Sequence, residues 1–427
     1  MNLAVIGSGG REHSICYKLK QSAKIKNLIC IPGNAGTKKI AKNINVDILN
    51  FDEVYRVIKN HNIDIVVVGP EEPLVNGIVE FLNEKEIRVL GPDKFASQLE
   101  GSKAFMKNLC KKNSIPTAKF GVFENFNKAV NFLMENNIPI VVKADGLAAG
   151  KGVTICKSIR EAKEKIKEIL EGKYESSKKV VLEEFLEGEE LSYFCIVDKN
   201  SYQFFGSAQD HKKVGEGDTG PNTGGMGAYS PSNLLTSKLE EKIKKKIIDP
   251  TLKAMKTLGH PYKGFLYAGL MISKGEPYLI EYNIRMGDPE CQVLMMRLKT
   301  DLLEIIDYAT KDKLNNLKIE WSNSDCITIV LCAKGYPGHY IKDSEIKNLS
   351  KIISNQTNQV FHAGTYEKNE KIFSSGGRVL NITNLGKDLA EARKKTLIEL
   401  KKINWSDGFF RKDIGWRAIK KNEDNQR

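Results

Sequence analysis

IVVKADGLAAGKGV, at residues 140–153, joins a short apolar run, one lysine and a loop rich in small residues. The β-branched residues Ile140 to Val142 favour a strand that ends at Lys143. Glycine lets the backbone come close to a ligand, and strings of backbone N–H groups form concave anion sites. We therefore predict a strand, a lysine and an anion-binding loop, followed by a second strand. The alternative is a glycine-rich hairpin with a solvated lysine, although Lys151 adds a second cation inside the loop.

The same loop does not fit the phosphate loop of P-loop enzymes. That motif requires G-x-x-x-x-G-K followed by Ser or Thr, and it opens a helix. Here Gly146 and Gly150 are one residue too close together, and Gly152 stands in place of the hydroxyl residue. The loop is also flanked by predicted strands, so we expect a different kind of nucleotide site.

Length and composition indicate a multidomain protein. A chain of 427 residues is too long for one hydrophobic core, while 41% hydrophobic and 28% charged residues are ordinary values. No run approaches the length of a transmembrane helix, and the start MNLAVIGSGG lacks the basic region of a signal peptide. The eight cysteines form no C-x-x-C pair and are predicted to be reduced core thiols. We expect a cytoplasmic protein without a membrane partner.

The net charge of +13 comes mostly from lysines spread along predicted helices. Such a charge suits anionic substrates and can raise their encounter rate. The chain lacks a dense basic arm and the aromatic–basic pattern of RNA-binding modules. We therefore predict small-molecule partners and no nucleic-acid partner.

The first hundred residues alternate short apolar strands with helical stretches. The predicted strands are Leu3–Ile6, Leu28–Ile31, Ile63–Val68 and Arg88–Leu90. This alternation is typical of a parallel α/β sheet, in which ligands bind beyond the carboxyl ends of the strands. Two polar loops follow predicted strands there, so both are candidate parts of a site.

The first of these loops, GSGGREH, does not match a dinucleotide-binding fingerprint, because Glu12 occupies the third glycine position. Gly9, Gly10 and Arg11 nevertheless suit a single phosphate at a helix N-terminus, with a purely structural turn as the alternative. Glu71, in the second loop, can accept hydrogen bonds from sugar hydroxyls or an amine, or it can be a solvated turn residue.

Downstream of the glycine loop, a predicted strand at Val180–Leu182 runs into EEFL, Glu183–Leu186. Backbone groups at such an edge can pair with adenine, while Phe185 and Leu186 cover its faces. Glu190 is placed to bind ribose hydroxyls. EEFL alone is a weak signal, and it gains weight from the lysine strand and glycine loop before it.

Glu281 and Asn283 lie two apart on a predicted strand, so their side chains share one face. Two oxygen ligands with open positions suit Mg²⁺, which keeps waters and is completed by substrate phosphates. Arg285 is expected on the same face, where its planar fork can bind phosphate or carboxylate. A polar stripe on an edge strand is the alternative.

The remaining regions give weaker signals. The glycine-dense stretch Gln209–Tyr229 is predicted as a long irregular loop, and loops of that length are usually functional. His211, within it, is equally a substrate contact or a polar loop residue. Residues 236–257 are predicted as a helix with a kink at Pro250. Residues from about 326 onward predict a small α+β unit with little that looks catalytic, although Arg378 could touch a ligand.

Together these motifs resemble the glycinamide ribonucleotide synthetase (phosphoribosylamine–glycine ligase) family of the ATP-grasp superfamily. The similarity covers essentially the whole chain. Its motifs are Gly7–His13, Pro32–Thr37, Gly69–Glu71, Leu99–Lys103, Lys143–Gly152, Glu183–Leu186, Asp210–Lys212, Asp218–Pro231, Glu281–Glu290, His362–Thr365 and Arg411–Arg417. Each is weak alone, but their combination and order are highly specific.

The resemblance implies a multidomain fold of α/β and α+β type. It implies an N-terminal parallel α/β (pre-ATP-grasp) domain at residues 1–102, on the phosphoribosylamine side. A central ATP-grasp domain is expected at 103–315, with a mobile lid at about 119–190, and a small C-terminal α+β domain at 325–422. In this family ATP lies between two small subdomains and is clamped by the glycine loop.

The family's reaction joins glycine to 5-phosphoribosylamine through glycyl phosphate, giving glycinamide ribonucleotide, ADP and phosphate in de novo purine biosynthesis. The resemblance therefore implies a carboxylate–amine ligase that uses ATP as a co-substrate and Mg²⁺ or Mn²⁺ as its metal. It also implies a monofunctional chain that is a monomer or a weak homodimer.

The resemblance also implies roles for individual residues. Expected contacts to ATP are Lys103, Lys143, Gly146, Gly150, Lys151, Gly152, Glu183, Glu184, Phe185, Leu186 and Glu190. Expected contacts to the other substrates are Gly9, Gly10, Arg11, Glu12, Glu71, Asp210, Lys212, Gly225, Arg285, Gly287 and Asp288. The expected catalytic residues are Arg285 and Lys143, and the expected metal ligands are Glu281 and Asn283.

The strand before Glu281 departs from ATP-grasp enzymes at large, and three other functions stay open. Many such enzymes carry a metal carboxylate on the strand before the Glu-x-Asn strand, but Tyr267–Ile272 has none, which leaves the ligands of a second metal undefined. A carboxylating or formyl-transferring purine enzyme is one alternative. A nicotinamide-dependent oxidoreductase and a basic nucleic-acid binder are the others, although the missing fingerprint and the dispersed lysines argue against both.

Overall fold

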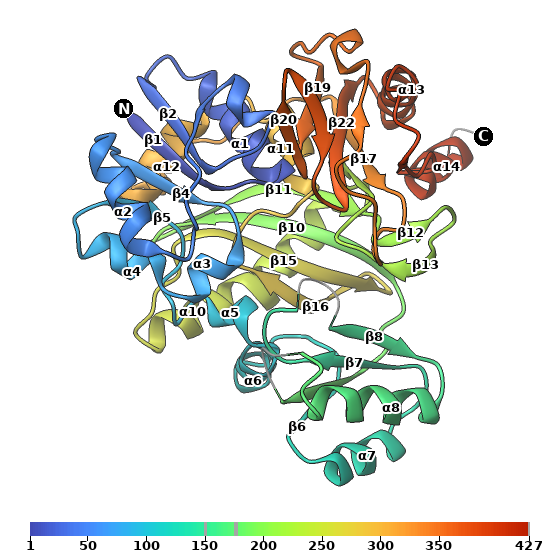
Figure 1. The fold of residues 1–427 in the computed structure, drawn as a ribbon. Coiled ribbons are helices and arrows are strands. Elements are labelled where there is room, and N and C mark those ends of the chain that lie inside the picture. The colour runs from blue at the N-terminus through green and yellow to red at the C-terminus, as the bar shows by residue number, and fades with distance from the viewer. Residues whose placement is uncertain (149–151, 175–177, 426–427) are drawn as a thin grey trace.

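The structure is a computed structural model, and it describes residues 1–148, 152–174 and 178–425. Figure 1 shows the N-terminal sheet and the C-terminal strands side by side above a large central sheet, with a smaller unit below them. Three separate regions of chain therefore border one another around the middle of the molecule.

The N-terminal region forms a five-stranded parallel sheet, which confirms the predicted α/β pattern. The strand order is β3-β2-β1-β4-β5. Its strands are β1 (Asn2–Gly7), β2 (Asn27–Pro32), β3 (Lys42–Asn43), β4 (Ile65–Val68) and β5 (Arg88–Leu90). Its helices are α1 (Gly10–Lys20), α2 (Phe51–Asn60), α3 (Glu71–Val75), α4 (Ile78–Asn83) and α5 (Gln98–Gly101). Because α1 and α3 begin just beyond β1 and β4, both polar loops lie at the carboxyl edge of the sheet.

Helix α6 (Lys103–Lys112) leads into the smaller unit, which we call the lid. The lid is an antiparallel sheet of order β6-β9-β7-β8 with two helices packed on it. Its elements are β6 (Phe120–Phe123), α7 (Phe126–Met134), β7 (Ile140–Ala144), β8 (Val153–Cys156), α8 (Ile159–Leu170) and β9 (Val180–Glu184). Since β7 pairs with antiparallel β8, the glycine loop joins two strands as predicted. The first turn of α8 is fixed by Ser158, whose Oγ accepts from Glu161 N at 3.2 Å.

The largest sheet joins the central and C-terminal regions in the order β16-β15-β10-β11-β14-β17-β22-β19, with β23 also paired to β17. The central strands are β10 (Glu189–Val197), β11 (Tyr202–Asp210), β14 (Gly227–Ser230), β15 (Gly264–Ser273) and β16 (Glu276–Asn283). The C-terminal strands are β17 (Asp325–Ala333), β19 (Asn358–His362), β22 (Arg378–Gly386) and β23 (Gly408–Phe409). The antiparallel pairing of β14 with β17 makes the two regions continuous.

Smaller elements complete these two regions. The helices are α9 (Ser237–Ile243), α10 (Asp249–Thr257), α11 (Glu290–Arg297), α12 (Leu302–Thr310), α13 (Leu389–Leu400) and α14 (Trp416–Asn425). A hairpin of β12 (Lys213–Gly215) and β13 (Thr219–Asn222) projects from the central region. A three-stranded sheet of β18 (Glu345–Ile346), β20 (Thr365–Lys368) and β21 (Lys371–Ser374) projects from the C-terminal region.

Two local predictions differ from the structure. The stretch Gln209–Tyr229 is more regular than predicted, because it contains the β12–β13 hairpin and most of β14. The predicted helix at 236–257 is present, but its irregularity is a π-helical turn at Lys244–Ile248, just before Pro250. Proline lacks an N–H donor, so it is well accommodated in the first turn of α10.

The eight cysteines are free and buried, which confirms their prediction as core thiols. Within residues 1–148, 152–174 and 178–425, no helix has both the length and the apolar character needed to cross a membrane.

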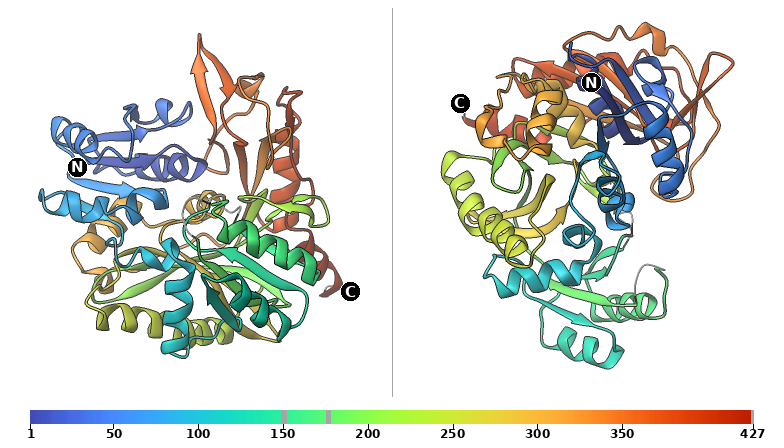
Figure 2. Two further views of the ribbon diagram at one scale, coloured as in Figure 1. Left: turned by 60° about the horizontal axis from the view of Figure 1, so that its bottom comes forward. Right: turned by 90° about the vertical axis from the view of Figure 1, so that its left-hand side faces the viewer.

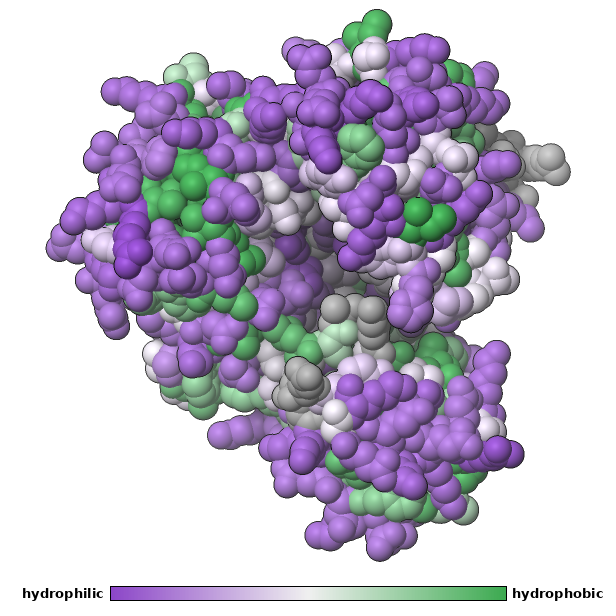
Figure 3. Space-filling view, viewed as in Figure 1, coloured by the Kyte–Doolittle hydropathy of each residue, from purple (hydrophilic) through white to green (hydrophobic). Residues whose placement is uncertain are grey.

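The lid stands apart from the other regions in the right-hand view of Figure 2, attached through α6 and the β9–β10 connection. Figure 3 shows a hollow between the lid and the rest of the molecule, with mostly hydrophilic visible walls. A cavity of about 550 Å³ lies where the lid faces α3 and the end of α5. Its lining includes Glu72 and Asn76 on one side and Gly146 and Tyr174 of the lid on the other.

Candidate functional site

Lys143 lies near the end of β7 and is almost completely buried. Its Nζ lies 2.7 Å from Oε1 of Glu183 in β9. Burial opposes ionisation of Glu183, but the charges of Lys143 and Lys107 outweigh it and lower the pKa of that carboxyl. The sequence predicted that Lys143 lies at the end of a strand. The structure shows in addition that Lys143 forms a buried ion pair with Glu183, a residue expected to contact adenine.

Lys103 approaches the same loop from the start of α6. Its Nζ donates a hydrogen bond of 2.8 Å to the carbonyl oxygen of Gly146. The first turn of α6 is held in place by Asp145, which accepts from the Ser102 hydroxyl and from Ala104 N, each at 3.1 Å to Oδ1. Burial lowers the pKa of Lys103, against the attraction of nearby carboxylates. Two lysines distant in sequence thus border the beginning of the glycine loop.

Glu281, on β16, lies among cations. Lys212 Nζ is 3.7 Å from Glu281 Oε1 and 2.8 Å from Oε2 of Glu190, the residue expected at ribose. Burial opposes ionisation of Glu281, but Lys212, Lys143 and Lys103 outweigh it, so its pKa is lowered. Burial also opposes the charge on Lys212, and Glu190 and Glu281 overcome that effect to raise its pKa. The charges of β7, β16 and α6 therefore act on one another in a single site.

The two candidate metal ligands lie on β16, in the part that pairs with β15. Glu281 is opposite Gly269, and Asn283 is opposite Tyr267. Gly269 gives Glu281 room, since a Cβ atom there would lie 3.2 Å from Glu281 Cγ. Among the described residues, no group of three or more His, Cys, Asp or Glu side chains could hold a metal ion. Two protein oxygens with open positions fit Mg²⁺, whose other ligands are usually water and phosphate.

The EEFL segment ends β9, an inner strand of the lid sheet, and leads into the connection to β10. Glu184 N donates to the carbonyl of Lys119 at 2.9 Å, and Glu184 Oε1 accepts from Lys119 N at 2.8 Å. The side chains of Glu184 and Phe185 are exposed, and Leu186 is partly exposed. The segment therefore offers accessible apolar surface beside the buried Glu183 carboxylate.

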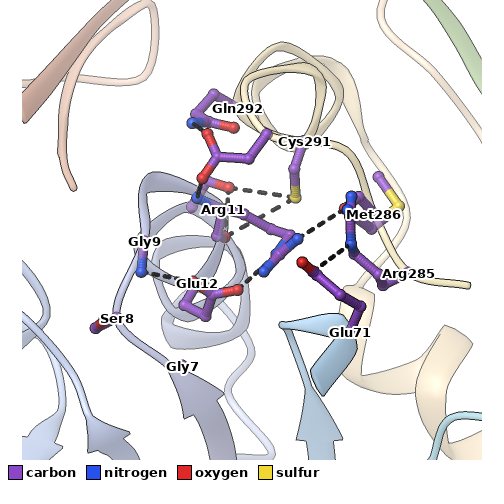
Figure 4. Close-up of polar contacts among 12 residues, drawn as sticks. Gly7, Ser8, Gly9, Arg11, Glu12, Glu71, Arg285, Met286, Cys291 and Gln292 are labelled. Atoms are coloured by element: carbon purple, nitrogen blue, oxygen red, sulfur yellow. Dashed lines mark hydrogen bonds and ion pairs between the residues drawn. The ribbon is translucent and has the colours of Figure 1, made fainter. Parts of the chain in front are cut away.

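At the N-terminus of α1, protein carboxylates accept the backbone N–H groups that were predicted to bind phosphate. Glu12 Oε2 accepts from Gly9 N at 2.6 Å, and Asp288 Oδ2 accepts from Arg11 N at 3.3 Å. The Arg11 guanidinium lies 2.5 Å from Glu12 Oε1 and donates to the carbonyl of Met286 at 3.2 Å. Figure 4 shows Arg11 between Glu12 and Met286. The structure therefore brings the predicted substrate-binding residues together. Their polar groups bind one another in this structure, rather than facing an open phosphate site.

Arg285 joins the N-terminal and central regions. Its Nε lies 3.0 Å from Glu71 Oε2, its Nη2 lies 2.7 Å from Glu100 Oε1, and Figure 4 shows the Glu71 contact. The Arg285 charge lowers the pKa of Glu71 to about 2, while burial raises the pKa of Glu100 to about 7. The guanidinium fork is therefore fixed in direction by two carboxylates before any substrate binds.

Asp210, at the end of β11, carries a buried acceptor without a donor. Its Oδ1 has no hydrogen-bond partner among the described residues. Burial raises the pKa of this carboxyl, and the nearby charge of Glu290 adds to the effect. A Cβ atom at Gly225, where φ is +112°, would lie 2.6 Å from that oxygen, so the glycine keeps the space beside it open. An unpaired buried carboxylate suits a cationic donor such as an ammonium group.

The other predicted glycines are points of close approach. A Cβ atom at Gly287 would lie 2.3 Å from Glu290 Oε2, and one at Gly10 would lie 2.5 Å from Asn381 Nδ2. The Glu290 carboxylate accepts at 2.9 Å from the hydroxyl of Tyr267. These glycines therefore let α1 and the β16–α11 connection pack tightly against polar side chains.

Three further predictions have different outcomes. Gly150 and Lys151 lie outside the described residues, whereas Gly152 is the last residue before β8. His211 has a structural contact: its Nε2 accepts from Gly415 N at 3.0 Å, and burial lowers its pKa to about 4, while its buried Nδ1 has no hydrogen-bond partner among the described residues. It therefore ties the central region to the C-terminal segment.

Sequence reasoning missed Lys107 and Glu100, which pair with Glu183 and Arg285. Lys107 follows Lys103 by one helical turn, a spacing that could have drawn attention to it. Arg378 was considered only as a general ligand contact, and its Nη1 donates at 2.5 Å to the carbonyls of Gly224 and Asp288. No sequence signal indicates the contacts of Arg378 with Gly224 and Asp288, because these partners are remote in the chain.

Comparisons with known proteins agree along the whole chain. Three family profiles match in order: the phosphoribosylglycinamide synthetase N domain over residues 1–100, its ATP-grasp (A) domain over 101–291 and its C domain over 326–417. The phosphoribosylamine–glycine ligase of Brucella melitensis is 46% identical over 427 residues, covering 100% of both chains. The chloroplastic enzyme of that name from Arabidopsis thaliana is 48% identical over 422 residues, covering 97% of this chain and 79% of its own.

Solved structures show the same similarity. The crystal structure of phosphoribosylamine–glycine ligase from Thermotoga maritima has a TM-score of 0.83 and 34% identity, covering 97% of this chain and 100% of that one. The biotin carboxylase domain of Hydrogenobacter thermophilus 2-oxoglutarate carboxylase, described in complex with MgADP and bicarbonate, has a TM-score of 0.74. It is 18% identical and covers 96% of this chain and 91% of its own, so this likeness concerns the fold alone.

Proposed function

The chain belongs to the phosphoribosylglycinamide synthetase family, and from that membership we propose how its residues share the work of ATP, metal and substrate binding. It is an ATP-grasp ligase that joins glycine to phosphoribosylamine, a step of purine biosynthesis. The observation that supports the site assignment is the approach of β7, β9 and β16 to one another, with Lys143 paired to Glu183 and electrostatically linked to Glu281.

We assign ATP to the space between the lid and the central sheet. Lys103 and Lys143 would contact its phosphates, together with the start of the glycine loop. The segment from Glu183 to Leu186 would hold adenine, and Glu190 would hold ribose. This order of phosphate, adenine and ribose contacts follows the positions of the side chains. Lys103 and Lys143 lie beside the glycine loop, whereas Phe185 and Leu186 lie farther along the lid. Gly150 and Lys151 stay predicted phosphate contacts.

Glu281 and Asn283 would hold the metal, which we propose to be Mg²⁺ or Mn²⁺. Both side chains lie on one strand face, and Gly269 leaves space beside the carboxylate. When bound, the ion would neutralise phosphate charge and orient the transferring group. Lys103, Lys143 and Lys212 lie within electrostatic range of Glu281, so the metal would share a cationic environment suited to a polyphosphate.

The other substrates would lie towards α1 and β11. The unpartnered Asp210 oxygen suits an amine, and both glycine and phosphoribosylamine carry one. Arg11, Arg285 and Lys212 supply positive charge for phosphate or carboxylate groups, and Gly225 and Asp288, from two separate loops, complete the wall. Glu71 and Glu12 hold the two arginine side chains in place, so the predicted substrate role of these acids includes orienting their partners.

The proposed reaction has two transfers. A carboxylate oxygen of glycine forms a bond to the γ-phosphorus of ATP. At the same time the bond between the γ-phosphorus and the bridging oxygen breaks, and ADP leaves with that oxygen. The phosphoribosylamine nitrogen then bonds to the acyl carbon, loses a proton, and phosphate leaves with the electron pair of the broken C–O bond. Lys143 and Arg285 would stabilise developing negative charge, and positioning would supply most of the remaining acceleration. Lid closure would keep water from the acyl phosphate.

We assign the protein to the cytoplasm as a monomer or weak homodimer, acting on small molecules without a nucleic-acid or membrane partner. Eight buried free thiols are consistent with a reducing compartment.

Phosphate release from ATP tests this function directly. We expect release in Mg²⁺ only when ATP, glycine and phosphoribosylamine are all present, together with formation of the amide product. Replacing glycine and phosphoribosylamine by bicarbonate or formate with their acceptors should give no turnover. Full activity with either replacement would contradict the assignment in favour of a carboxylating or formyl-transferring enzyme.

A further inference from the structure

We propose that Lys107 is a positioning residue for ATP, which keeps Glu183 neutralised when Lys143 turns from that carboxylate to the nucleotide phosphates. The inference rests on the proposed function, because it needs Lys143 to contact ATP. Lys107 Nζ lies 2.7 Å from Glu183 Oε2, and Lys143 Nζ lies 2.7 Å from Oε1 of the same carboxylate. Glu183 therefore has one more cation than it needs.

Lys107 occupies a junction of the nucleotide site. It lies on α6, one turn after Lys103, and its charge pairs with β9 of the lid. Its Nζ also donates at 2.7 Å to Thr117 Oγ1, and that hydroxyl donates at 2.6 Å to the carbonyl of Leu279. Leu279 lies on β16, two residues before Glu281. One ammonium group thus connects the three segments to which we assign the phosphates, the adenine and the metal.

Burial makes this ammonium group energetically important. The Lys107 side chain is 0% exposed and that of Glu183 is 4% exposed, so neither charge is screened by water. A buried carboxylate without a counterion is strongly unfavourable. If Lys107 were absent, Glu183 would depend on Lys143 alone, and moving Lys143 to a phosphate would leave the carboxylate unpaired. ATP would then compete with Glu183 for one lysine.

Two simpler roles for Lys107 would give different results. If the side chain only filled space, its charge would not matter and its effect would not depend on Glu183. If it touched ATP itself, its loss would weaken binding whether or not Glu183 was charged. The charge of residue 183 therefore separates the positioning role from both.

The test compares MgATP binding by calorimetry and steady-state constants in a set of variants. Lys107→Met should raise the dissociation constant and the KM for MgATP by about tenfold or more, as expected for loss of a buried charged contact, while the KM for glycine stays within about twofold. Lys107→Arg should recover most of the affinity. Lys111→Met, which changes an exposed lysine of the same helix, is the matched control and should bind as the unsubstituted protein does.

The decisive comparison places Lys107→Met in a Glu183→Gln background. With no carboxylate to neutralise, the second substitution should change MgATP affinity by less than about twofold. The double variant removes one positive and one negative charge, so the net charge of the cluster stays as in the unsubstituted protein, and it keeps the test available if Lys107→Met alone does not fold. An equal loss of affinity in both backgrounds would overturn the inference, as would Lys107→Met behaving like Lys111→Met. Failure of the unsubstituted protein to bind MgATP would instead overturn the proposed function and the inference with it.

Discussion

Replacing Arg285 by Met should destabilise the protein as well as impair catalysis, because this side chain neutralises two carboxylates at the boundary of two regions. Arg285 lies 3.0 Å from Glu71 and 2.7 Å from Glu100, and its side chain is only 16% exposed. Without it, Glu71 and Glu100 would be neighbouring acids on which only the smaller effect of the Arg11 charge remains. The substitution keeps much of the apolar stem, so it removes mainly the charge and the planar fork.

The pKa of Glu71 gives the size of the effect. Arg285 is the main cause of its lowering from 4.5 to about 2, which corresponds to about 3 kcal/mol at 1.36 kcal/mol per unit. Because the folded pKa is below the unfolded one, this stabilisation is fully present above about pH 4.5 and is lost as the pH falls through about 2. Burial already raises the pKa of Glu100 to about 7, so that carboxyl can take up a proton and relieve part of the remaining repulsion.

Urea unfolding at pH 7.5, followed by tryptophan fluorescence, measures the loss. We expect Arg285→Met to lower the free energy of unfolding by about 2–3 kcal/mol after allowing for the 28% exposure of Glu71. Arg160→Met is the matched control, since Arg160 is 90% exposed and pairs with Glu164 on one helix face, and it should cost less than about 0.5 kcal/mol. Equal losses for the two variants would refute the reasoning.

Three further predictions concern the ligands. Glu281→Gln should lower Mg²⁺-dependent turnover by more than the roughly 10–100-fold typical of changes outside the metal ligands, with an unchanged circular dichroism spectrum; normal turnover would exclude the metal role. Lys143→Ala should weaken MgATP binding by roughly 1.5–3 kcal/mol in calorimetry, and equal affinity would count against its phosphate contact. Asp210→Asn should raise the urea midpoint at pH 7.5, because the raised pKa makes ionised Asp210 increasingly unfavourable above its unfolded pKa of about 3.8. The same variant should raise the KM for an amine substrate, and a lowered midpoint with unchanged KM values would contradict the assignment.

Local sequence patterns predicted much of the framework. The β-branched run before Lys143 forms β7, and the glycine loop returns directly into β8. The alternation of the first hundred residues gives the parallel sheet, with Arg88–Leu90 as its last strand. These features depend on the side-chain period and on residues near in sequence, so a single sequence contains enough information to predict them.

The charge network of the site could not be predicted in the same way. Arg285 pairs with acids 214 and 185 positions away, and Asp288 reaches α1 across 277 positions. Such contacts depend on how sheets from different regions pack, which no local pattern contains. The spacing of Glu281 and Arg285 predicted a shared site, and the charge of Arg285 does act on Glu281. The spacing gave no sign that two carboxylates would hold the guanidinium.

A structure determined with Mg²⁺ and a non-hydrolysable ATP analogue tests the central claim most directly. It should show one nucleotide with its phosphates at Lys143, its adenine along Glu183 to Leu186 and its metal on Glu281 and Asn283. A nucleotide bound elsewhere, or one that touches only one of these three segments, would contradict it.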